Sequence, residues 1–328
     1  MTSAITDGRA LIFRVEGSVP IVIEHPAVLE ARAQEKSYQP GQPAGIINNL
    51  SPTGTSRTSF NWKPRKAHAA HVVSQETEVV GSQRENRQEK SALILEPNFY
   101  QFTPFVQGQR IHDFLNPTRW YAGNVRYMEK TSFNTKKLEE EGYNAPDIDI
   151  LAFQGWEQCD VVHLHTHGNA ICRDPANPTP EGCTTYLTTG IHYSLDVFEE
   201  HRSEFMERKG HGLSISYGSI HEISKTIKAY EVVLLVDFFR YHYDSGELEN
   251  MILSFSACEI LFEADMAQAL REVSQDSDLF AFTKSVWTGD SQKAYTRLYR
   301  DMIQKGLPAK DAFDRMPAMG ERLGLESH

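Results

Sequence analysis

Apolar residues from residue 91 onward recur with two different spacings. Short apolar runs typical of buried strands occur in four segments: SALILEPNFY (91–100), NVRYMEK (124–130), CDVVHLHTH (159–167) and MILSFSAC (251–258). Helical spacing occurs in three others: LDVFEEHRSEFMERKG (195–210), EADMAQALREV (263–273) and SQKAYTRLYRDMIQKG (291–306). Strands that alternate with amphipathic helices predict an α/β fold whose mainly parallel central sheet is covered on both faces. Residues 225–243 fit a long strand and a helix equally well.

The first 90 residues have a different pattern. Residues 9–31 hold two short alternating runs, broken by Gly17 and Pro20, which predict a small strand pair. From residue 32 to residue 90, Pro, Gly, Ser, Gln and charged residues dominate, as is typical of a linker. We therefore expect an N-terminal extension of residues 1–90 and one α/β domain of residues 91–328. The basic stretch NWKPRKAHAAH (61–71) predicts a solvated loop, with contact to an acidic partner as the alternative.

The helix expected near the C-terminus has the clearest signals. Its apolar residues recur at i, i+3, i+4 and i+7: Tyr295, Leu298, Tyr299 and Met302. Ser291 is the expected N-cap, and Gly306 followed by Pro308 is expected to stop the helix. A second short helix should follow over residues 309–316. Trp287 and the aromatic residues of this region are expected in the core.

Charge and hydropathy exclude several classes of function. The 328 residues carry 33 Lys and Arg against 44 Asp and Glu, a formal net charge of -11 at pH 7. Because nucleic-acid binding needs clustered cations, we expect no direct contact with nucleic acid. The apolar runs, such as VVLLV (232–236), are too short to cross a bilayer, and MTSAITDGRALIFRV lacks a signal-peptide pattern. These features predict a cytoplasmic protein that does not bind membranes.

Four cysteines, at positions 159, 172, 183 and 258, are too few for a disulfide scaffold, and no CxxC pair suggests zinc. In a reducing compartment the expected state is the free thiol. We therefore expect Cys172 and Cys183 as thiols rather than as a disulfide, and Cys159 likewise as an incidental thiol. A reduced cysteine is also available as a nucleophile.

Two of the predicted strands end in reactive groups. One ends in His167-Gly168 and the other in Ser256-Ala257-Cys258. Open α/β sheets place their sites beyond the carboxyl ends of parallel strands, so the imidazole and the thiol can meet at one crevice. An adjacent imidazole favours the thiolate, which attacks a carbonyl. The amides of Gly168 and Cys258 could then stabilise the oxyanion.

The same residues carry a resemblance to a known family. VVHLHTHG resembles the strand and His-Gly motif of CHAT domains, the caspase-like branch of clan CD cysteine peptidases, and MILSFSACE resembles their strand ending in Ser-Ala-Cys-Glu. Downstream, SVWTGDSQKAYTRLYRDMIQKGLPAKDAF is similar to the family's Trp-containing strand, Asp-led turn and two closing helices. The resemblance covers residues 91–316 and says little about the first ninety.

The resemblance implies a caspase-like three-layer α/β/α sandwich and a cysteine endopeptidase that acts on a protein substrate without metal or organic cofactor. It implies that His167 is the general base and acid, Cys258 the nucleophile, and the amides of Gly168 and Cys258 the oxyanion hole. CHAT peptidases are often activated by a partner or ligand and work in bacterial, including antiviral, defence systems or on substrates such as gasdermins. We expect residues 1–90 to recruit such a partner or to restrain the enzyme.

The chain departs from the family's pattern in two places. ILFEAD follows Cys258-Glu259, where the family turns through Thr or Asn and Gly, so the shape of that loop is open. The Pro-rich segment 172–187 follows the His-Gly motif and is expected to border the substrate cleft, to gate it, or to be cut. An acidic lining would prefer a basic side chain in the substrate, but no motif supports any of the nearby acids: Asp160, Asp237 and Glu259.

Two alternatives remain open. Three histidines on one face of a strand, His163, His165 and His167, are also compatible with a metallohydrolase, although the further Asp and His ligands of such sites are not evident. Against this alternative, we expect His163 and His165 to be satisfied core or subsurface residues. The other alternative is a catalytically silent CHAT-like scaffold that only binds partners.

Overall fold

The computed structural model describes residues 3–6, 10–14, 21–24, 90–102, 104–133, 135–144, 148–172, 178–194, 196–197, 213–222, 225–316 and 325–327. All of them belong to one compact unit of residues 1–37 and 90–328. The linker expected at 32–90, with its basic stretch, and the helix expected at 195–210 lie almost entirely outside the described residues. The role and boundary of the N-terminal extension therefore stay predictions.

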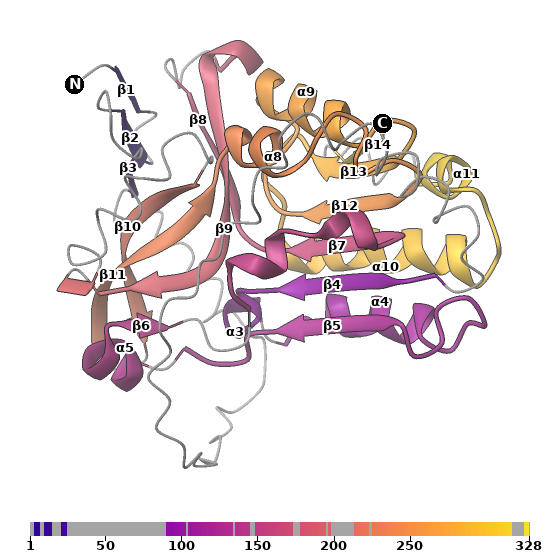
Figure 1. The fold of residues 1–328 in the computed structure, drawn as a ribbon, viewed down its shortest axis with the longest axis horizontal. Helices are drawn as coiled ribbons and strands as arrows, with labels where there is room; N and C mark the ends of the chain where they lie inside the picture. The colour runs from indigo at the N-terminus through magenta and orange to yellow at the C-terminus, as the bar shows by residue number, and fades with distance from the viewer. Residues whose placement is uncertain are drawn as a thin grey trace, which may run out of the picture. The chain divides into compact units, whose positions relative to one another are not determined.

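A mainly parallel sheet forms the centre of this unit, as the alternating pattern predicted (Figure 1). Five strands are parallel, and β14 pairs antiparallel with β13 at one edge. In spatial order they are β14 (Leu325–Ser327), β13 (Asp278–Phe282), β12 (Ile252–Ser256), β7 (Val161–His165), β4 (Ala92–Glu96) and β5 (Val125–Glu129). Strands β4 and β7 are buried along their whole length, which explains their continuous apolar runs.

Helices cover both faces of this sheet, an arrangement compatible with a three-layer sandwich. On one face the core cluster joins the sheet to three helices: α4 (Gln107–Leu115), α10 (Thr288–Ile303) and α11 (Ala309–Asp314). On the other face, Phe255 of β12 contacts the rings of Trp156 and Phe239, from η2 (Trp156–Gln158) and α8 (Val236–His242). The remaining helical segments are α3 (Phe99–Phe102), α5 (Thr135–Glu141), η1 (Ile150–Phe153), η3 (Pro180–Gly182) and α9 (Ala264–Val273).

A second sheet of eight strands was not predicted as such (Figure 1). Its strands are antiparallel neighbours except for β3 and β10, which run parallel. In order they are β1 (Ser3–Thr6), β2 (Ala10–Arg14), β3 (Ile21–Glu24), β10 (Leu213–Glu222), β11 (Lys225–Leu234), β9 (Cys183–Tyr193) and β6 (Tyr143–Asn144), with β8 (Gly168–Cys172) beside β9. The predicted strand pair is therefore present as β2 and β3. The ambiguous segment 225–243 is both a strand and a helix, β11 followed by α8.

Two predictions about helix α10 are wrong. Ser291 is not its N-cap, because the helix begins at Thr288 and the buried Ser291 hydroxyl lies 2.5 Å from that of Ser256 on β12. Trp287 is not a core residue, because 69% of it is exposed. The buried aromatic stripe and the stop are as expected: the helix ends at Ile303, and Gly306 has a φ of 66°.

The free-thiol expectation for Cys172 and Cys183 is also wrong. These residues stand opposite each other at the end of the β8–β9 hairpin and form a disulfide. The hydrogen-bond alternation makes this a non-hydrogen-bonded pair, in which opposing side chains are closest. Segment 172–187 is consequently not one excursion, since its last five residues belong to β9. Residues 173–177 lie outside the described part of the chain.

Within the described ranges, no helix has both the length and the apolar character needed to cross a membrane.

Candidate active site

The two predicted reactive strand ends lie side by side. Strands β7 and β12 are parallel neighbours, and their last paired residues are His165 and Ser256. The amide of Thr166 then donates to the Ser256 carbonyl at 3.2 Å. His167 and Cys258 each follow two residues after that last pair, at the same edge of the sheet. Adjacent strands lie only about 4.8 Å apart, so the two segments leave the sheet as neighbours.

Gly168 brings the two segments into direct contact. A Cβ added to Gly168 would lie 2.3 Å from the Cys258 carbonyl oxygen and 3.2 Å from the Ala257 Cβ. Real side chains do not approach a backbone atom so closely, so this position accepts only glycine. The predicted role of Gly168 as a site of close backbone approach fits this geometry, although the group that approaches it here is the main chain of Cys258 rather than a substrate.

The Gly168 amide is oriented toward the Cys258 loop. The Thr188 amide donates to the His167 carbonyl at 3.0 Å, so the alternation of an antiparallel ladder directs the Gly168 N–H away from β9. Ala170, two residues further along the same edge, has its N–H on the same side, and it donates to the Glu259 carboxylate at 2.9 Å. The Gly168 N–H therefore points to the side on which Cys258 and Glu259 lie.

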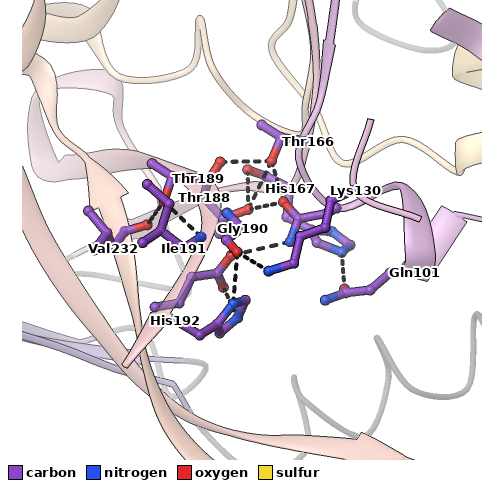
Figure 2. A network of polar contacts seen from close by, with 12 residues as sticks. Gln101, Lys130, Thr166, His167, Thr188, Thr189, Gly190, Ile191, His192 and Val232 are labelled. Atoms are coloured by element: carbon purple, nitrogen blue, oxygen red, sulfur yellow. Dashed lines mark hydrogen bonds and ion pairs between the residues drawn. The ribbon is translucent and has the colours of Figure 1, made fainter. Parts of the chain in front are cut away.

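The His167 imidazole is held by two residues of the short helix α3. Its Nε2 lies 2.6 Å from the Gln101 Oε1, and the Phe102 ring packs at a centroid distance of 4.7 Å. Figure 2 shows Gln101 at the ring of His167, with Thr166 and Thr188 close to the backbone of the same residue. The imidazole is half-buried, and its hydrogen bond to Gln101 together with the packing of Phe102 restricts the rotation of the ring.

A buried polar network supports the backbone behind His167 (Figure 2). The hydroxyls of Thr166 and Thr188 both donate to the Asn98 Oδ1, at 2.7 and 3.0 Å. The Asn98 amide in turn donates to Glu231, which also accepts from the Gly190 N–H at 3.1 Å. The network thus joins the carboxyl end of β4 to strands β9 and β11 of the second sheet.

Gly190 closes this network with a backbone conformation that favours glycine. Its φ is 69°, and an added Cβ would lie 2.3 Å from the Pro97 carbonyl oxygen. The Gly190 carbonyl accepts from the buried Lys130 ammonium at 2.5 Å and from the His192 ring at 2.9 Å. The charge of Lys130 also lies 5.6 and 5.4 Å from the rings of Tyr100 and Phe133. A buried ammonium needs such partners, because an unpaired charge is costly in the interior.

The Cys258 thiol is half-buried and is held by main-chain groups of a neighbouring loop. The Val286 amide donates to Sγ at 3.3 Å, and the thiol donates to the Val286 carbonyl at 3.5 Å. Trp287, exposed on the surface, follows directly. The sulfur therefore lies at a surface loop, whereas the strand that leads to it is buried.

Glu259 fixes the turn that follows Cys258. Its φ of 60° is left-handed, a conformation that costs non-glycine residues energy. Its carboxylate accepts from the Ala170 N–H at 2.9 Å and from the Ser285 hydroxyl at 2.6 Å. The open question of the loop shape after Cys258 is thereby answered: one glutamate connects β8, the turn after Cys258 and the 284–287 loop.

The other two acids considered as pocket linings lie elsewhere. Asp160 accepts from the Ser91 amide at 2.7 Å, at the amino end of β7, which is the edge of the sheet opposite the site. Asp237 belongs to the first turn of α8. Neither is part of the arrangement around His167 and Cys258.

His163 and His165 are buried and bonded within the core, as the sequence predicted. His163 accepts from the Gln107 amide at 3.0 Å and donates through Nδ1 to the Ser254 hydroxyl at 2.7 Å. Burial, and then the nearby His165, hold the pKa of His163 well below its usual range, so its ring is neutral. With both ring nitrogens bonded, His163 has no lone pair for a metal.

His165 belongs to a second buried cluster centred on Glu96. The His165 Nδ1 lies 2.7 Å from the Glu96 Oε1, which also accepts from the Gly108 amide at 3.0 Å. The Tyr127 hydroxyl donates to the other carboxylate oxygen at 2.6 Å, and burial followed by the charge of Glu96 raises the pKa of Tyr127. Among the residues that the structure describes, no three His, Cys, Asp or Glu side chains gather as a metal site requires.

Three residues of this arrangement were missed from the sequence: Gln101, Glu259 as a brace, and Val286. A signal existed for Gln101 alone. It follows the carboxyl end of the predicted strand 91–100, so it belongs to the same edge of the sheet as His167.

Comparisons with known proteins add nothing to the geometry: no protein-family model, no curated protein and no solved structure matches the chain.

Proposed function

We propose that this protein is a cysteine endopeptidase with a caspase-like three-layer α/β/α sandwich, in which Cys258 is the nucleophile and His167 the general base and acid. The observation that supports this most directly is the contact of Gly168 with the main chain of Cys258, which puts an imidazole-bearing and a thiol-bearing strand end at one place. The CHAT-like motifs at the same two strand ends support the same assignment.

The proposed reaction is acyl transfer to sulfur. His167 takes the proton of the Cys258 thiol, and the thiolate attacks the carbonyl carbon of a peptide bond. The oxyanion that forms is stabilised by main-chain N–H groups, for which the Gly168 amide has a suitable direction. His167 then protonates the departing amine, leaving a thioester, and water attacks that thioester to release the acid and restore the thiol. This sequence uses no metal or organic cofactor.

The thiol's contacts with Val286 suggest a regulated enzyme. A sulfur that donates to a carbonyl is a protonated thiol, and it must leave that carbonyl to become the attacking thiolate. We propose that the isolated protein visits the reactive arrangement part of the time, and that a partner or ligand, such as a defence-system trigger, acts through residues 1–90 or the 284–287 loop to increase that share. The same contacts favour one rival, a silent scaffold in which the thiol never leaves Val286.

A labelling experiment on the full chain tests the assignment, and Cys159 provides a matched control. Cys159 and Cys258 are the two free cysteines, and both are half-buried. A peptidyl acyloxymethyl ketone should modify wild-type protein and the Cys159→Ala variant, but neither Cys258→Ala nor His167→Ala. Equal labelling of both thiols, unaffected by His167→Ala, would overturn the proposal. New protein termini that depend on Cys258, found by mass spectrometry, would then identify the substrate.

A further inference from the structure

We infer that Gln101 is the positioning residue of the proposed pair: its amide oxygen fixes the tautomer and orientation of the His167 imidazole. The inference rests on the proposed function, and it assigns a role to a side chain that no motif suggested. The carrying observation is the 2.6 Å contact between the Gln101 Oε1 and the His167 Nε2.

The direction of this hydrogen bond follows from the partners of the Gln101 amide. The amide nitrogen of Gln101 donates to the Tyr100 hydroxyl at 2.7 Å, and the amide oxygen is the end that faces His167. A carbonyl oxygen can only accept a hydrogen bond. The His167 Nε2 must then carry a hydrogen, and in the neutral ring Nδ1 becomes the basic nitrogen.

Helix α3 is anchored firmly enough to position a ring. The Tyr100 amide donates to the Lys130 carbonyl at 2.9 Å, and the Gln101 amide donates to the Asn98 carbonyl at 2.8 Å. The Tyr100 ring packs on Phe133 at 5.8 Å. Phe102, whose ring lies 4.7 Å from that of His167, is also stacked on His165 at 4.3 Å. One helix thus supplies both the hydrogen bond and the ring contact of the imidazole.

An amide at this position has a different electrostatic effect from a carboxylate. A carboxylate beside Nε2–H would favour the imidazolium and raise the pKa of His167, whereas a neutral amide orients the ring without adding charge. A Gln101→Glu variant should therefore keep the orientation and shift the pH dependence. A Gln101→Leu variant, similar in size, should lose the orientation.

The test measures alkylation of Cys258 by iodoacetamide, a small reagent that needs no protein substrate, in the full chain carrying Cys159→Ala. Rates are taken between about pH 5 and pH 9, which spans the ordinary pKa values of histidine and cysteine. We expect Gln101→Leu to lower the rate near pH 6.5 by about tenfold, the size of one lost hydrogen bond. Near pH 9 the thiol ionises without help, and the rate should approach that of the parent.

Two further variants complete the set. Gln101→Glu should restore the rate and extend it to higher pH, because the imidazolium that stabilises the thiolate then persists. Gln109→Leu is the matched control: Gln109 is exposed on α4, bonds Asp113 at 2.7 Å, and should leave the profile unchanged. Nitrogen NMR of the His167 ring gives a readout that mere destabilisation would not move, since the Nε2–H tautomer should dominate in the parent and lose its dominance in Gln101→Leu.

The outcomes separate the two levels of the argument. If His167→Ala leaves the alkylation profile unchanged, the proposed function fails. If His167→Ala lowers the rate but folded Gln101→Leu behaves as the parent, in rate and in tautomer, then the role of Gln101 is refuted and the peptidase proposal stands.

Discussion

The two halves of the candidate site are built differently. The His167 half is braced by buried side chains from several elements: Asn98, Phe102, Thr166 and Thr188. The Cys258 half is held by the main chain of Val286, in a loop whose neighbours Ser285 and Trp287 are exposed. Segments with few buried contacts open at lower free energy than the core. The difference teaches that the His167 ring is held in place by the core, whereas the loop around Cys258 can be displaced at a lower cost in free energy.

The first and largest effect should come from removing the buried carboxylate on the histidine half. Glu96→Ala leaves His165 and the Gly108 amide without their shared acceptor, whereas the Tyr127 hydroxyl keeps the Glu129 carboxylate. We expect a loss of about 3–5 kcal/mol in the free energy of unfolding, measured by urea denaturation. Glu140→Ala is the control, because its ion pair with Lys136 is exposed and should be worth less than about 0.5 kcal/mol. If both variants lost the same free energy of unfolding, the buried contacts of the His167 half would not be the source of its stability.

An intermediate effect should come from Glu259, which joins the halves. Glu259 and the exposed Asp276 have nearly the same left-handed φ, 60° and 58°. Asp276→Gly only relieves that conformation, so it should stabilise the protein by up to about 1 kcal/mol. Glu259→Gly gains the same relief but leaves the buried Ala170 amide without its acceptor, at a cost of about 1–3 kcal/mol.

Thermal and urea unfolding of these two glycine variants should therefore give shifts of opposite sign. Shifts of the same sign would show that the Glu259 carboxylate does not stabilise the turn after Cys258.

The smallest effect on stability should come from the tryptophan beside the thiol. Trp287→Ala removes a side chain that is 69% exposed, and the free energy of unfolding should change by less than about 0.5 kcal/mol. Trp156→Ala, which empties a fully buried position, should cost about 3–5 kcal/mol. A large loss for Trp287→Ala would mean that the thiol loop is as firmly packed as the core.

Sequence reasoning succeeded where the signal is local. Buried parallel strands such as β4 and β7 read as continuous apolar runs, and α10 repeats its aromatic residues with helical period. Sequence reasoning failed where a side chain contacts a residue that is distant in the sequence. Ser291 resembles a cap until Ser256 is seen opposite its hydroxyl.

The second sheet shows the same limit. Strand β9 is rich in threonine and follows a Pro-rich stretch. Its first five residues, 183–187, are therefore predicted as part of a loop, and only the pairing of β9 with β8 sets Cys172 against Cys183. The site itself was predicted as far as its strand ends, because parallel strands share one edge. Gln101 and Val286 were not, since neither residue type indicates a contact partner on its own.

The order of the strands along the chain has a consequence for synthesis. Strands β4, β5 and β7 are synthesised before β12, and β12 is synthesised before α10, the helix that packs against it. Tyr295 of that helix bonds the carbonyls of Phe255 and Phe280, so β12 and β13 are secured only after α10 has emerged. Since a chain folds as its segments become available, a nascent polypeptide should not hold Cys258 in its final position until residues up to about 303 have been made, and the proposed activity would be absent before that point.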